Sequence, residues 1–316
     1  MRIGFAACSA AAFLFCVSSC AAQSATETPV AAGGSETATP APVSAPTSAP
    51  ALPRIEAAPS SGMLDLGFRN LYELNFKGGR AKFLSYQKLE PNDPLGKAAE
   101  AASYLYEQFN AKGIFASDFF LNDAKFLGGA QGSASDNRND EFLAANHQAR
   151  EMAAQRLKVD PRDSHALLVL TFTDGMEADY DALIVKKQMA GLGLTKQADA
   201  EAAKLLAVDP TAEDAYMALG AANYIIGCLP SYKRAFLWFG GIHGDRERGM
   251  EQLQRAAEHG HYLQPFAKAW LALASEREHQ PERARQLLTE LAAEFPNNPL
   301  FAHELALVDR AAAVKK

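Results

Sequence analysis

Cysteine and histidine side chains are the clearest candidates for chemistry in this sequence. Cys20 ends an apolar stretch, in the tetrapeptide VSSC, and its thiol could form a thioether with a diacylglycerol. Cys228 could act as a nucleophile beside a histidine, but a buried thiol before Pro230 is the simpler interpretation. His259 and His261 could share a metal ion, yet no acidic or cysteine cluster follows at ligand spacing. We therefore expect no metal site, no cofactor and no enzyme activity.

The chain begins with the features of a secretory signal. Arg2 is the only charged residue before Glu27, and residues 3–17 are mostly apolar. This apolar stretch is too short for a comfortable membrane span, so it predicts a secretory signal. An ordinary signal would be cut after Ala22, and Cys20 would then be lost.

The tetrapeptide that ends at Cys20 resembles the lipidation motif of bacterial lipoproteins, in which an aliphatic residue and two small residues precede the cysteine. The resemblance predicts a signal peptide at 1–19 and a lipid on Cys20. Two or more acyl chains, at about 0.8 kcal/mol per buried CH2, hold a protein firmly on a membrane. Ala21 follows the cysteine where Asp favours inner-membrane retention in that family. The resemblance therefore implies the outer membrane, facing the periplasm, if the source is Gram-negative.

Residues 20–61 are rich in alanine, proline, serine and threonine and have too little apolar surface to form a core. We expect a disordered linker that lets a domain at 62–316 stand clear of the membrane. The net charge is -6, and loss of residues 1–19 would remove Arg2 and no acid, giving -7. No strongly basic block occurs, so nucleic acid is not expected as the main partner.

One short motif recurs along residues 62–316: an apolar residue, a turn with proline, and then a new helical pattern. Its copies are LEPNDP at 89–94, KVDPRD at 158–163, AVDPTA at 207–212 and EFPNNP at 294–299. Proline ends a helix, and Asp or Asn caps the next one. The repetition predicts an array of helical hairpins.

The segment from Pro265 to Pro299 is one step of about 34 residues and resembles a tetratricopeptide repeat (TPR). Ala272 and Ala284 stand where that family has small residues between its two helices, and Gly220 matches the same position in DAYMALGAANY. The resemblance implies an all-α fold, a right-handed superhelix of antiparallel hairpins with irregular repeats. Residues 299–311 are expected to form a C-terminal capping helix.

The periodicity predicts helices between these turns. Residues 163–190 are expected to form one long helix, or two helices broken near Asp174-Gly175. The insert CLPSYKRAFLWFGG is expected to cover the junction between two hairpins. The other expected helices are 63–76, 79–89, 95–110, 141–157, 195–206, 216–226 and 245–258.

The second half of the chain also resembles a narrower group. GDRERG at 244–249, GHY at 260–262 and FPNNPLF at 295–301 are similar to segments of bacterial TPR proteins related to the tetratricopeptide-39 and inclusion-body clearance proteins. This resemblance supplies no catalytic motif.

Two functions follow from these observations. The first is a membrane-anchored scaffold that holds a protein or peptide on its concave face, where Tyr216 and Asn223 are candidate groove residues. Ordinary packing is the simpler interpretation for Tyr216. The second is a small-molecule-binding accessory lipoprotein of a solute importer, by resemblance to TPR components that enclose a pore. An enclosed apolar cavity at the 228–242 insert would favour the second function, and an open groove the first.

Overall fold

The computed structural model describes residues 61–122, 125 and 138–314, and within these ranges the regular secondary structure is helical. The chain divides after Arg54 into two units, and every described residue belongs to the second. The predicted signal peptide, Cys20 and nearly all of the predicted linker lie outside the described residues. Among the described helices, none combines the length and apolarity that a membrane crossing requires.

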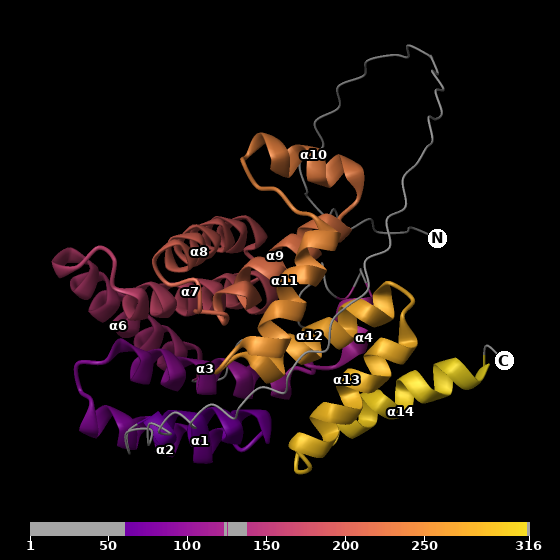
Figure 1. The fold of residues 1–316 in the computed structure, drawn as a ribbon, viewed down its shortest axis with the longest axis horizontal. Helices are drawn as coiled ribbons and strands as arrows, with labels where there is room; N and C mark the ends of the chain where they lie inside the picture. The colour runs from indigo at the N-terminus through magenta and orange to yellow at the C-terminus, as the bar shows by residue number, and fades with distance from the viewer. Residues whose placement is uncertain (1–60, 123–124, 126–137, 315–316) are drawn as a thin grey trace, which may run out of the picture. The chain divides into compact units, whose positions relative to one another are not determined.

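Helices that follow one another pack as hairpins (Figure 1). We call the first helix of each hairpin its A-helix and the second its B-helix. The pairs are α1 (Ser61–Tyr72) with α2 (Phe76–Leu89), α3 (Pro94–Ala111) with α6 (Arg138–Val159), α7 (Ser164–Asp179) with α8 (Gln188–Val208), α9 (Ala215–Cys228) with α11 (Arg246–His259), and α12 (Gln264–Arg277) with α13 (Pro281–Glu294). The terminal helix α14 (Pro299–Val314) packs on α13, and the short elements are α4 (Ser117–Leu121), the π-helix η1 (Tyr180–Val185) and α10 (Ser231–Phe239). The predicted all-α, TPR-like array with a capping helix is confirmed.

The recurring turns start helices as predicted. The Asp93 carboxylate accepts the backbone N–H of Leu95 at the start of α3. Asp163 does the same for Ala166 in α7. Each cap satisfies a backbone donor that has no partner inside its own helix.

Small residues set the distance between A- and B-helices. A Cβ atom on Gly220 of α9 would lie 2.8 Å from the backbone nitrogen of Leu253 on α11. A Cβ atom on Gly249 would lie 2.5 Å from the backbone nitrogen of Tyr224. The two helix backbones therefore approach too closely for any side chain, and the predicted position of Gly220 in the repeat is correct.

Of the two alternatives for residues 163–190, the structure favours one long helix, because α7 runs directly into η1, which ends at Val185. The backbone continues through Asp174 and Gly175, because Asp174 is buried and paired with Arg150 of α6 at 2.9 Å. The break comes after η1, where Lys186 takes a left-handed conformation with φ 65°. The next helix, α8, then begins at Gln188 rather than near residue 195.

The insert does not cover a junction between hairpins, so that prediction was wrong. It forms α10, which stands off from the other helices beyond the ends of α9 and α11 (Figure 1). Leu237 is the only buried residue of this helix. Its other large side chains are 61–82% exposed: Tyr232, Phe236, Trp238 and Phe239.

The first hairpin contacts the last repeat, so the two ends of the array meet. The Tyr72 hydroxyl of α1 donates to the carbonyl of Tyr262 at 2.7 Å. The Asn298 amide, before α14, donates to the carbonyl of Tyr72 at 2.8 Å. The ring of Tyr72 also lies 5.5 Å from that of Phe295, and Phe68 lies 4.8 Å from Tyr262. These contacts join the first and last repeats across the concave face, which is partly enclosed and partly open.

Candidate functional site

A cavity of about 400 Å³ lies on this concave face. Its walls come from every A-helix, together with α4, α8 and α14, so distant parts of the sequence meet there. Drug-sized ligands occupy pockets of roughly 300–1,000 Å³ in proteins. The 228–242 insert contributes only Leu229 to this cavity, whereas a smaller one of about 70 Å³ is lined in part by Cys228, Leu229 and Pro230.

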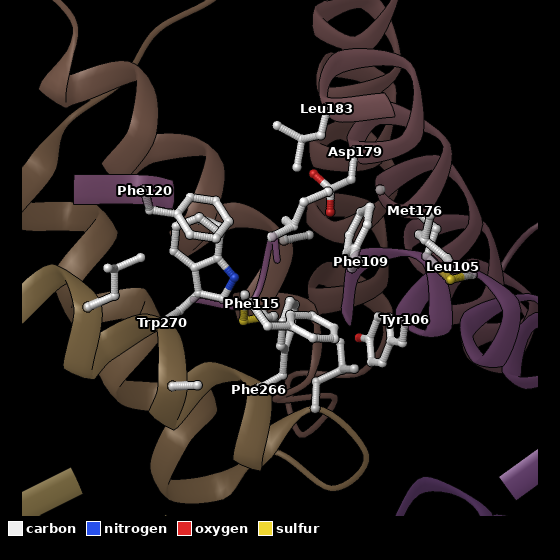
Figure 2. Close-up of a pocket in the computed structure, with 18 of the residues that line it drawn as sticks. Leu105, Tyr106, Phe109, Phe115, Phe120, Met176, Asp179, Leu183, Phe266 and Trp270 are labelled. Atoms are coloured by element: carbon white, nitrogen blue, oxygen red, sulfur yellow. The ribbon is translucent and has the colours of Figure 1, made fainter. Parts of the chain in front are cut away.

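Aromatic side chains form much of the cavity wall, and Figure 2 shows them facing a common space. Phe120 of α4 lies against Trp270 of α12, with ring centroids 4.9 Å apart. Tyr106 of α3 lies 5.6 Å from Phe115 and 5.5 Å from Phe266. These edge and tilted contacts hold the rings in place while leaving their inner faces toward the cavity.

The charged groups of the wall are all acidic. The charged residues that line the cavity are Asp179, Asp199, Asp214, Glu276 and Glu304. No lysine, arginine or histidine of the described ranges lines it. The cavity therefore offers negative charge and hydrogen-bond acceptors without a built-in cation to balance them.

Asp179 has the highest accessible fraction of these acids because its carboxyl faces the cavity, where protein atoms still surround it. It ends α7, directly before η1, and makes no capping hydrogen bond to that helix. Figure 2 shows its carboxyl pointing into the space between Leu183 and Phe109. Burial among apolar groups raises the pKa of Asp179 to about 7. Single π-turns often occur at functional sites.

Two further carboxyls share this raised pKa. Burial raises the pKa of Asp199, on α8, to about 7. Its Oδ1 has no hydrogen-bond partner among the described residues. Burial, and then the nearby charge of Glu304, raise the pKa of Glu276 on α12 to about 7. Near neutral pH, all three groups can therefore either hold or release a proton.

The remaining two acids support the fold. Asp214 accepts the backbone N–H groups of His261, Tyr262 and Leu263 at 2.9–3.0 Å, and so joins the start of α9 to that of α12. Glu304 accepts the hydroxyl and, at 3.3 Å, the backbone N–H of Ser117, joining α14 to α4.

Tyr216 and Asn223, the predicted groove residues, face α11 and not the cavity. The Arg255 guanidinium lies 4.4 Å from the centre of the Tyr216 ring. The Asn223 amide donates to Gln252 at 2.8 Å. Both side chains are half-buried. Partner binding at these two residues stays a prediction, and the structure brings neither of them into the cavity.

The other candidates for chemistry are separated from one another. His261 Nε2 lies 2.9 Å from Asp65 Oδ1, whereas His259 lies 3.7 Å from Glu258. In the described ranges no group of three metal-ligating side chains occurs. Burial raises the pKa of the Cys228 thiol, which disfavours the reactive thiolate.

Comparisons with known proteins add little beyond the fold. The chain matches no family model, and it has no significant match among curated protein sequences. A thermophilic TPR protein from Thermus thermophilus is similar in structure, with 14% identity and a TM-score of 0.43. The match covers 79% of this chain and 98% of that chain. The fold assignment therefore rests on the helix pairing of this chain itself. Arrays of this kind are typically interaction scaffolds.

Proposed function

We propose that this protein is a lipid-anchored binding protein of the cell envelope that holds an apolar small molecule in its central cavity. One observation carries the proposal: contacts between the first and last repeats turn the concave face into an apolar cavity of about 400 Å³. The predicted lipid on Cys20 and the linker at 20–61 would keep this cavity near the membrane. Its outer-membrane location is part of the same proposal.

The chain carries a natural reporter for this proposal. It has two tryptophans, the exposed Trp238 on α10 and Trp270 in the cavity wall. In a Trp238→Phe background, only Trp270 emits. A brominated neutral ligand, ω-bromodecanol, should then quench Trp270 saturably in the full chain held in lipid nanodiscs. Empty nanodiscs give the correction for partition of the ligand into lipid.

A matched pair of variants locates the ligand. Ala218 of α9 lines the cavity and is half-buried, so Ala218→Phe should fill part of the space and abolish saturable quenching. Ala144 is exposed on α6, so Ala144→Phe should leave quenching unchanged. Equal quenching in all three proteins would contradict the proposal, provided that circular dichroism shows them folded.

A second candidate function is capture of a protein partner on α10. The exposed rings of Tyr232, Phe236 and Phe239 follow one helical face, at spacings of four and three residues. Such an aromatic patch is unusual on a surface exposed only to water and is typical of interaction sites. This site would serve the scaffold function at a surface other than the concave face.

Photo-crosslinking in intact cells tests this second function. A photoreactive amino acid at Phe239 should yield a defined protein adduct, and the same group at the exposed His303 of α14 should not. Phe236→Asp should remove the adduct because it places a charge in the patch. Adducts of equal yield at both positions, or adducts to lipid alone, would rule out partner capture by α10.

A further inference from the structure

The polar groups of the cavity wall restrict the ligand that it can hold. The wall has five carboxyls and no basic side chain among the described residues. An anionic ligand would lose its hydration, meet the five carboxyls, and gain no cationic partner, which is costly in an apolar site. A neutral apolar ligand would leave Asp199 Oδ1 without a hydrogen-bond partner and would offer no donor to the uncapped Asp179 carboxyl.

A ligand that carries a positive charge and an apolar body would find a complementary group for each in the cavity wall. Asp179 points into the cavity and has no capping partner, so it is available to an N–H donor on the ligand. The faces of Trp270, Phe115 and Phe120 surround the same space (Figure 2). These rings offer an apolar surface to the rest of a ligand whose charged group lies at Asp179.

We infer that the cavity binds an organic ammonium with an apolar tail, its charged group at Asp179 and its tail among the aromatic rings of α3, α4 and α12. This inference rests on the proposed function and specifies its ligand class. An ammonium donor would pair with the Asp179 carboxylate as a charge-assisted hydrogen bond. The ammonium group would thereby supply a hydrogen-bond donor to the uncapped Asp179 carboxylate.

The raised pKa of Asp179 predicts that binding of an ammonium ligand depends on pH. The titratable groups that line the cavity with Asp179 are Tyr72, Tyr106, Asp199, Asp214, Glu276 and Glu304. Asp179 has a pKa of about 7, so it is mostly protonated at pH 6 and mostly ionised at pH 8. An ammonium ligand should therefore bind about ten-fold more tightly at pH 8 than at pH 6. A neutral alcohol should show no such gain.

Three brominated ligands with the same decyl body form the experiment: ω-bromodecylamine, ω-bromodecanol and ω-bromodecanoate. Quenching of Trp270 in the full-length Trp238→Phe protein in nanodiscs reports their affinities. We expect the amine to bind at least ten-fold more tightly than the alcohol, and the carboxylate to bind most weakly. Asp179→Asn keeps the side-chain shape and should remove most of the amine preference, whereas Glu276→Gln should reduce it less.

The outcomes separate this inference from the proposed function. If the alcohol binds as tightly as the amine, the ammonium inference is wrong while the apolar site stands. If the carboxylate binds best, it is also wrong. An amine preference that survives both Asp179→Asn and Glu276→Gln would show that these carboxyls do not carry it. If no ligand gives saturable quenching, the proposed function fails as well.

Discussion

At the scale of single residues, the acids of the cavity determine the chemistry of the molecule. Asp179, Asp199 and Glu276 lie among apolar groups, and burial raises the pKa of each to about 7. An unfolded chain would ionise these groups near pH 4. The folded protein therefore keeps carboxyls that cost stability once they are ionised, a feature more typical of binding sites than of structural cores.

These shifts predict how stability depends on pH. Between about pH 4 and pH 7 the native state binds more protons than the unfolded state, so stability contributed by these groups falls as the pH rises. The thermal midpoint should be higher at pH 5.5 than at pH 8. Asp199→Asn should flatten this profile because it removes one such carboxyl. Asp140→Asn, at an exposed position on α6, should not. An unchanged profile in Asp199→Asn would contradict the assignment.

No signal in the sequence marks these acids as cavity residues. Asp179 ends an apolar helix in which Ala178 and Leu167 are buried, and no feature of the pattern separates it from a solvent-facing acid. Tyr106 is buried like a core aromatic, yet it also lines the cavity. Periodicity predicts which face of a helix is apolar, but it does not distinguish packed core from cavity wall.

At the scale of elements, the hairpins follow from short-range patterns that the sequence displays. The caps at Asp93 and Asp163 and the small residue at Gly220 were all predictable, because each acts within one turn or one hairpin. The break at Lys186 was not, because it depends on η1 and on the burial of Asp174 against α6. The exposure of α10 also depends on the absence of a packing surface, which the pattern of a single helix does not show.

The contact between α9 and α11 gives a stability prediction. Gly220→Ala should destabilise the protein by about 1–3 kcal/mol, because the new Cβ would meet backbone atoms of α11. Gly193 on α8 is the matched control, since nothing lies within 4 Å of a Cβ there. Gly193→Ala should be neutral or stabilising by up to about 1 kcal/mol. Chemical denaturation measures both, and equal effects at the two glycines would show that the close approach is wrong.

At the scale of the whole molecule, contacts between the two ends of the array turn the concave face into a partly enclosed cavity. The predicted scaffold would leave an open concave face, whereas Tyr72 and Asn298 join the two ends. These contacts link residues 190 and 226 positions apart in the sequence, a distance over which no local pattern gives information. The hairpins could therefore be predicted, and the cavity could not.

The predicted anchor gives a test of location. Cys20→Ser removes the thiol that would carry the lipid, so the protein should leave the membrane fraction or remain unprocessed. Fractionation of cells and analysis of the N-terminus would show this. Recovery of the wild-type protein in the soluble fraction, with an N-terminus after Ala22, would contradict the anchor.

A crystal structure of the protein with ω-bromodecanol tests the central claim most directly, because anomalous scattering locates the bromine without bias. If the central cavity binds the ligand, a single strong bromine peak should lie within the space bounded by Phe109, Phe115, Phe120 and Trp270. A strong peak on α10 with none in the cavity would contradict it.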